Sequence, residues 1–135
     1  MYKPIAEINL QNLLQNCKYI KSLIGECQFF PVVKADAYGH GISKISKFLN
    51  NSQYVDGLCV AMPNEAELLL SQKINKPIFV LGKFDFGNEL LLSHKNIIPT
   101  IHCFDDIAKI KSLKKKGIKL PVQLKLDTGM GRMGI

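Results

Sequence analysis

The chain has 135 residues, of which 47% are hydrophobic, and a net charge of +7 at neutral pH. This length allows one modest domain with a core of its own, and the hydrophobic content excludes a disordered tail or a linker. No apolar run reaches the roughly 18 residues that a membrane span needs, and the first residues lack the pattern of a signal peptide, so we expect a cytoplasmic protein without a membrane partner.

The positive charge and the cysteines give no indication of a nucleic-acid or metal site. Much of the charge lies in KIKSLKKKGIK, residues 109–119, a pattern typical of the basic C-terminal end of a helix. Aromatic residues are not interleaved with these lysines, so a solvated face is favoured over a nucleic-acid partner. The four cysteines form no CxxC pair, which favours buried free thiols in a reducing compartment over a zinc or redox site.

The first predicted elements are a helix and a strand. In NLQNLLQNCKYIKSLIG, residues 9–25, apolar residues recur at helical spacing, with Asn9 suited to the start and Gly25 to the end. QFFPVVK, residues 28–34, follows as a compact apolar strand, although Pro31 donates no hydrogen bond and is awkward in a central strand. After the turn ADAYGHG, a second helix is expected over residues 42–49.

The rest of the chain alternates strands with helices. The predicted strands are YVDGLCVAM (54–62), PIFVLG (77–82), NIIPTIHC (96–103) and LPVQLKLD (120–127). The predicted helices are PNEAELLLSQK (63–73), a short one over 88–92 and one from Asp105 or Asp106 to Gly117, and the tail TGMGRMGI (128–135) reads as a loop. This alternation predicts an α/β fold with a parallel sheet and right-handed crossovers. A five-stranded doubly wound sheet fits, as does part of an eightfold β/α barrel, which typically needs about 250 residues.

Lys34, at the end of the first predicted strand, is the main candidate for chemistry. In either architecture, functional groups gather at the carboxyl ends of parallel strands. Partial burial there would favour the neutral amine, which can attack an aldehyde. The small residues that follow let a ligand approach the backbone, and the phenol of Tyr38 can hydrogen-bond a phosphate. From spacing alone, the simpler explanation is a lysine that reaches solvent, followed by an ordinary turn.

The segment VVKADAYGHG, residues 32–41, closely resembles the pyridoxal phosphate (PLP) attachment motif of bacterial alanine racemases. The resemblance implies that Lys34 binds PLP covalently at the end of the first barrel strand and acts on the Cα proton of the D-isomer. It also implies that Tyr38 contacts the cofactor phosphate. A doubly wound nucleotide-binding module would need GxGxxG or GxxxxGK[ST] here, and the segment contains neither. The resemblance therefore favours the N-terminal part of a (β/α)8 TIM-type barrel, incomplete, with about five strands.

A second segment, KLDTGMGRMGI, residues 125–135, resembles the family pattern KxDTGMGRxG. Strand alternation would turn Lys125 toward the barrel interior, with Arg132 on the loop beyond, and two cations in a partly buried pocket would repel each other. The resemblance implies that Lys125 is carbamylated and that the resulting anion positions Arg132. It implies further that Arg132 contacts the PLP phenolic oxygen and lies close to the substrate carboxylate. The alternative is an unmodified Lys125 paired with Asp127, with a surface arginine.

Three histidines and one aspartate are weaker candidates. His102 falls near the end of the fourth predicted strand, where it could line the pocket, although the family motif does not require it. His40 and Asp36 lie inside the first motif and are interpreted as supports of the turn. His94 reads as a surface or loop residue.

The resemblance also implies what residues 1–135 do not supply. In the family, the second base is a tyrosine from the other subunit of a homodimer, and it lies later in the chain, as do an arginine facing the PLP ring nitrogen and a C-terminal β-domain. We therefore expect residues 1–135 to be the N-terminal portion of a PLP-binding racemase barrel, without the remaining barrel and the β-domain. With open edges on its first and fifth strands, such a piece should be unstable or aggregated and should not racemise.

The predicted activity of the whole protein is PLP-dependent interconversion of L-alanine and D-alanine, which supplies D-alanine for peptidoglycan in the cell wall. Two alternatives stay open. One is a racemase of broader specificity, acting for example on serine, because specificity comes largely from other parts of the family's chain. The other is a non-catalytic PLP-binding fragment that keeps Lys34 but lacks the second base.

Overall fold

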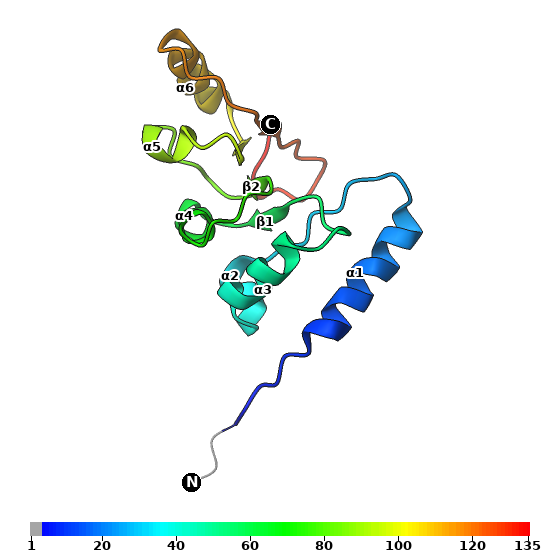
Figure 1. Ribbon diagram of the computed structural model, residues 1–135. Coiled ribbons are helices and arrows are strands. Elements are labelled where there is room, and N and C mark those ends of the chain that lie inside the picture. Colours follow the sequence, from blue (N-terminus) through cyan, green and yellow to red (C-terminus); the bar gives the residue numbers. More distant parts are fainter. Residues whose placement is uncertain (1–3) are drawn as a thin grey trace.

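The structure, a computed structural model, describes residues 4–135 as alternating helices and parallel strands (Figure 1). The elements are α1 Leu10–Ile24, α2 Lys34–Gly39, α3 Ile42–Asn50, β1 Leu58–Val60, α4 Pro63–Ser71, β2 Ile78–Val80, α5 Glu89–Leu92, β3 Ile97–Ile101, α6 Phe104–Lys115 and β4 Gln123–Leu124. Each predicted helix and four of the five predicted strands lie near their expected positions, and these four strands are shorter than predicted.

The order of the strands decides between the two architectures that fit the sequence. Strands β1 to β4 lie in chain order, and each pairs in parallel with the next. A doubly wound sheet reverses direction at a switch point, whereas a β/α barrel adds each strand beside the previous one. The observed order is that of part of a barrel.

The first predicted strand is reduced to a single bridge, in which Val32 pairs in parallel with Cys59. The Cys59 N–H donates to the Pro31 carbonyl at 2.9 Å, and the Val33 N–H donates to the Cys59 carbonyl at 2.8 Å. Pro31 accepts but has no N–H to donate, so the ladder cannot extend toward Phe29 with regular spacing. The extended segment nevertheless lies beside β1 and gives the sheet its fifth member.

The core lies between the sheet and the helices that follow its strands. Leu58, Val60, Ile78 and Val80 are completely buried, and Ile97 continues the same face on β3. Figure 1 shows α4, α5 and α6 along one side of the strands. The other face carries Cys59, Phe79 and Ile98 in register. In a closed barrel, this second face lines the interior.

The first helix has the predicted bounds and caps but is less buried than expected. The Asn9 side chain accepts the N–H groups of Gln11 and Asn12, and Gly25 caps the other end. Of its residues only Cys17 is buried, while Leu23 is 67% exposed. Leu10 and Leu13 are partly buried and pack against the core, so α1 lies at its edge.

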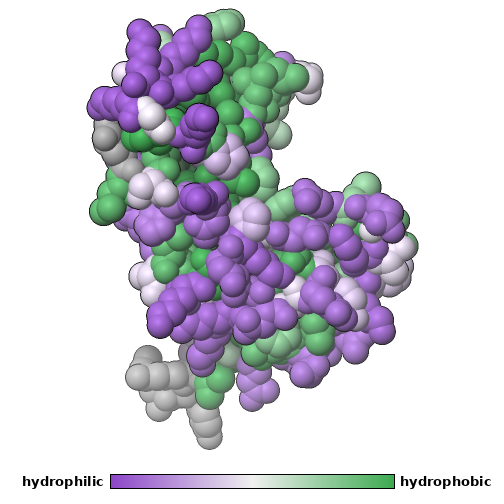
Figure 2. Space-filling model, turned by 45° about the horizontal axis from the view of Figure 1, so that its top comes forward, coloured by the Kyte–Doolittle hydropathy of each residue, from purple (hydrophilic) through white to green (hydrophobic). Residues whose placement is uncertain are grey.

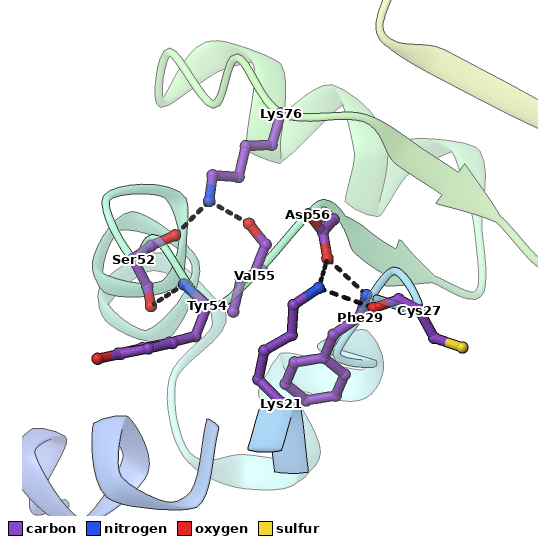
Figure 3. Close-up of polar contacts among 8 residues, drawn as sticks. All are labelled: Lys21, Cys27, Phe29, Ser52, Tyr54, Val55, Asp56 and Lys76. Carbon is purple, nitrogen blue, oxygen red and sulfur yellow. Dashed lines mark hydrogen bonds and ion pairs between the residues drawn. The ribbon is translucent and has the colours of Figure 1, made fainter. Parts of the chain in front are cut away.

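The amino ends of the strands are held together by a group of charged side chains (Figure 3). Lys21 Nζ donates to Asp56 Oδ2 at 2.9 Å and to the Cys27 carbonyl at 2.7 Å. The Phe29 N–H also donates to Asp56 Oδ2, at 2.7 Å, and this bond, with that from Lys21, lowers the pKa of Asp56. Lys76 donates to the carbonyls of Ser52 and Val55, and burial lowers its pKa. This end of a barrel is the one associated with stability.

The surface mixes hydrophilic and apolar residues (Figure 2). The last turn of α6 carries Lys114 and Lys115, as the sequence predicted for a basic helix end. Large apolar side chains are exposed on the last strand and the tail, where Leu124, Leu126 and Met130 are 54%, 62% and 75% exposed. Those side chains lack the cover that helices give to the other strands.

Candidate active site

Lys34 stands where the first extended segment enters an unusual turn. The next four residues, Ala35 to Tyr38, form a left-handed helical turn with φ between 51° and 55°. This conformation costs residues with a side chain roughly 1–2 kcal/mol each. None of these four residues is glycine, the residue that adopts this conformation at the least cost. The surrounding structure must therefore hold the turn in place.

Several hydrogen bonds inside the motif support this turn. The Asp36 carboxylate accepts the Ile42 N–H at 2.8 Å, and its carbonyl accepts the Gly41 N–H at 2.9 Å. The Ala37 N–H donates to the Val33 carbonyl, and His40 Nδ1 lies 2.8 Å from the Ala37 carbonyl. Asp36 and His40 thus support the turn, as the sequence analysis interpreted them.

A further support, which the sequence analysis missed, is the carboxylate of Glu65 on α4. One oxygen accepts the Ala35 N–H at 2.7 Å, and the other accepts the N–H groups of Ala61 and Met62 at 2.8 and 2.9 Å. The sequence did hold one signal, because Glu65 is the third residue of a helix that begins at Pro63. A glutamate at that position often reaches back to the residue before the helix.

A cleft of about 500 Å³ opens at the carboxyl ends of the strands. Its walls come from Lys34, Ala61, Met62, Leu81, Gly82, Gln123, Leu124, Lys125, Leu126, Arg132 and Met133. The cleft brings together three of the predicted site residues, although 91 positions (125 minus 34) separate Lys34 from Lys125 in the chain. With three cationic side chains around a space of ligand size, it suits a small anionic molecule.

Tyr38, the fourth predicted site residue, lies beside this group but does not line the cleft. Its side chain is 60% exposed, and its ring centroid lies 6.0 Å from Lys34 Nζ. Two other hollows, of about 450 and 610 Å³, lie between the N-terminal segment and α3. Neither is lined by Lys34, Lys125 or Arg132, so the cleft at the carboxyl ends is the better candidate site.

Lys125 lies directly after the end of β4 and continues the alternation of its side chains. The Gln123 side chain donates to Thr100 Oγ1 at 2.5 Å, and this contact places Gln123 on the same face as its register partner. Lys125, two residues further, therefore shares that face. Its own N–H donates to the Ile101 carbonyl at 3.0 Å, which continues the pairing of β4 with β3.

Arg132 is carried by a compact loop that Asp127 organises. The Asp127 carboxylate accepts the N–H groups of Gly129 and Gly131 at 2.9 and 3.1 Å, and these bonds lower its pKa. The chain end returns to the strand, because the Ile135 N–H donates to the Lys125 carbonyl at 2.9 Å. Asp127 thus serves the loop backbone, and the nearby charge of Lys125 is a further, smaller cause of its lowered pKa.

His102 is buried but lies outside the residues that line the cleft. Its backbone N–H donates to Asp106 Oδ2 at 3.0 Å. Its two ring nitrogens have no hydrogen-bond partner within residues 4–135. The expectation that it could line the pocket is therefore not supported. His94 is exposed, as predicted.

The cysteines are free thiols. Cys17 and Cys59 are buried, whereas Cys27 and Cys103 are exposed, which corrects the expectation that all four are buried. Burial raises the pKa of Cys59 to about 11. The described part of the chain contains no group of three or more His, Cys, Asp and Glu residues that could hold a metal ion. No helix in residues 4–135 has the length and apolar character to cross a membrane.

Known proteins are similar to this chain in sequence and fold. Residues 8–135 match the family described as "Alanine racemase, N-terminal domain". An alanine racemase from Clostridium kluyveri is 41% identical over 135 residues, which cover 98% of this chain and 34% of that protein.

Solved structures agree with this match. An alanine racemase from Clostridium difficile 630 superposes with a TM-score of 0.85 at 35% identity, covering 98% of this chain and 36% of its own. A histidine racemase from Leuconostoc mesenteroides subsp. sake superposes with a TM-score of 0.81 at 28% identity, covering 93% and 34%. The chain spans about a third of the length of these relatives. The sheet is the N-terminal part of the alanine racemase (β/α)8 barrel, and the chain belongs to the alanine racemase N-terminal domain family.

Proposed function

We propose that the protein containing this chain is a PLP-dependent alanine racemase, which interconverts L-alanine and D-alanine and supplies D-alanine for peptidoglycan. The observation that carries the proposal is the cleft in which Lys34, from an attachment-type motif, meets Lys125 and Arg132. PLP is an anionic molecule of modest size, and both the volume of the cleft and its cationic lining suit it. When bound, PLP withdraws electrons from the substrate Cα and makes its hydrogen acidic.

In this proposal, each residue has a distinct task. The amine of Lys34 holds PLP covalently and, when released, moves a proton at Nζ on one face of Cα. The phenol of Tyr38 donates to the cofactor phosphate. The guanidinium of Arg132 donates to the cofactor phenolic oxygen and to the substrate carboxylate. Lys125, once carbamylated, accepts hydrogen bonds from Arg132 and so orients it.

The second proton handler, for the opposite face of Cα, belongs to a part of the protein outside residues 1–135. A homodimer, with a tyrosine of the partner subunit near Lys34, would supply it. We place the enzyme in the cytoplasm. Residues 1–135 then form the N-terminal portion of the PLP-binding barrel, and the remaining barrel and a C-terminal β-domain lie in the rest of the protein.

The test uses the complete protein loaded with PLP. Borohydride reduction followed by peptide mapping should locate PLP on Lys34, and Lys34→Ala should abolish exchange of the alanine Cα proton with solvent. Lys47→Ala, an exposed lysine on α3, is the matched control and should keep full exchange. Label on another lysine, or exchange that survives in Lys34→Ala, would rule out the proposed role.

The identity of the substrate is the part of the proposal for which a specific alternative exists. The fold is shared with a histidine racemase, so a racemase that acts on another amino acid is the second candidate. Exchange rates for alanine, serine and histidine, measured side by side, distinguish the two. Bound PLP without exchange on any of them would favour a non-catalytic PLP-binding protein.

A further inference from the structure

The carboxylate of Glu65 connects three backbone segments around the cleft. Oε1 accepts the N–H of Ala35, which directly follows Lys34. Oε2 accepts the N–H groups of Ala61 and Met62, which follow β1 and line the cleft. All three distances lie between 2.7 and 2.9 Å, so each is a well-formed hydrogen bond.

The bond to Ala35 differs from the other contacts of the left-handed turn. The bonds through Asp36, Ala37 and His40 join residues close in the sequence, within 33–42, and they would persist if the turn and the start of α3 moved as a unit. The bond from Ala35 to Glu65 instead spans 30 positions of the sequence. It is therefore a side-chain bond that fixes the turn relative to the end of β1.

The location of this bond matters because Ala35 is the first strained residue, with φ at 51°. The orientation of the Lys34 side chain depends on the backbone on both sides of its Cα. On one side, the Val33 N–H is held by the Cys59 carbonyl at 2.8 Å. On the other side, the Ala35 N–H is held by Glu65, so both flanks of Lys34 are tied to the β1–α4 region.

Both oxygens of Glu65 are engaged by backbone donors, and Glu65 does not line the cleft. A role in proton transfer at the substrate is therefore disfavoured. We propose that Glu65 is a positioning residue, which aims the amine of Lys34 into the cleft by holding the left-handed turn against the end of β1. This inference rests on the proposed function of Lys34 as the residue that binds PLP.

The matched control lies two positions further along the same helix. Glu67 is exposed, and its Oε1 accepts the Asn88 side-chain amide at 3.1 Å, away from Lys34. Glu67→Ala removes a carboxylate from α4 with no effect on the turn. Glu65→Gln is the conservative variant, because an amide keeps one accepting oxygen but presents a donor on its other side.

The test compares wild type, Glu65→Ala, Glu65→Gln and Glu67→Ala in the complete protein. In the protein stripped of PLP, we expect amide exchange of residues 34–39 to rise about tenfold or more in Glu65→Ala, because a bond to a charged acceptor is lost. After PLP is added, its attachment to Lys34 should slow and the pH profile of the lysine–PLP absorbance band should shift. Glu65→Gln should show the same changes to a smaller extent, and Glu67→Ala none.

Two results would overturn the inference. One is exchange and absorbance in Glu65→Ala that match those of Glu67→Ala. The other is a lower melting temperature with uniformly faster exchange but an unchanged lysine–PLP band, since that pattern belongs to a merely structural residue. If wild type itself does not attach PLP to Lys34, the proposed function fails, whereas the amide exchange of residues 34–39 still reports separately whether Glu65 holds the turn.

Discussion

At the scale of single residues, the proposed role of Lys125 depends on a covalent change. Lys125 and Arg132 line one cleft, and two uncompensated cations there would repel each other. Carbamylation, as proposed above, would convert the Lys125 ammonium into an anion and remove this repulsion.

We therefore expect the complete, PLP-loaded protein to take up ¹³C-bicarbonate and to show a carbamate signal by ¹³C NMR. The signal should disappear in Lys125→Ala and persist in Lys109→Ala, a change on α6 that lies outside the cleft. An unmodified Lys125 in an ordered, PLP-loaded protein would contradict this assignment.

Asp56 allows a second prediction at the residue scale, which concerns stability and pH. The Phe29 N–H and the Lys21 ammonium lower its pKa in the folded state, so its contribution to stability is present above the unfolded-state pKa of about 3.9 and is lost as pH falls through the lower folded value. Asp56→Asn should cost about 1 kcal/mol of the free energy of unfolding near neutral pH. Urea unfolding should show this difference shrinking below about pH 4. A difference that is constant down to pH 2 would contradict the mechanism.

At the scale of elements, the left-handed turn of α2 predicts that a substitution by glycine raises the free energy of unfolding, whereas such substitutions usually lower it. Ala35 is exposed and has φ at 51°, so Ala35→Gly should relieve strain and raise the free energy of unfolding by up to about 1 kcal/mol. Ala108→Gly, in the exposed part of α6, should lower it by about 0.5–1 kcal/mol. Thermal unfolding of the complete protein measures both. Equal destabilisation by the two changes would show that Ala35 is not strained.

The same element shows where sequence reasoning succeeds and where it stops. Periodicity and caps located the helices, because Asn9 and Gly25 act locally on α1. The handedness of the turn was not readable from KADAYGHG, since Ala35 and Tyr38 do not favour that conformation by themselves. The bond from Glu65 to Ala35 was missed for the same reason, although the helix-start position of Glu65 was a visible signal.

Strand lengths were the other element-scale error. The alternation of apolar residues extends beyond the paired region, because side chains can alternate where the backbone no longer finds a partner. Pro31 is the clearest case, since its missing N–H limits the first segment to one bridge. The apolar run over residues 28–34 predicted a full strand even though Pro31 is awkward in a central strand.

At the scale of the whole molecule, the cleft could be predicted only once the order of the strands was known. Composition left a doubly wound sheet and a barrel equally open, and the motifs favoured the barrel. The parallel pairing of consecutive strands then brought Lys34 and Lys125 to the same end of the sheet. The meeting of Lys34, Lys125 and Arg132 is thus a consequence of topology that pairwise spacing in the sequence cannot show.

A prediction at this scale concerns residues 1–135 produced by themselves. Edge strands with unpaired backbone groups and exposed apolar side chains such as Leu124, Leu126 and Met130 favour association between copies. We expect this piece to aggregate in size-exclusion chromatography and to show no racemisation of alanine. The complete protein is the control, and measurable racemisation by the purified piece would refute the prediction.

The charged group formed by Lys21, Asp56 and Lys76 lies at the opposite end of the strands from the cleft. Substitutions that test stability near Asp56 can therefore be made without disturbing the surroundings of Lys34. Conversely, under the proposed function, variants that change the substrate can be confined to the loops beyond the strands. Stability and the candidate site can thus be varied separately, at opposite ends of the same sheet.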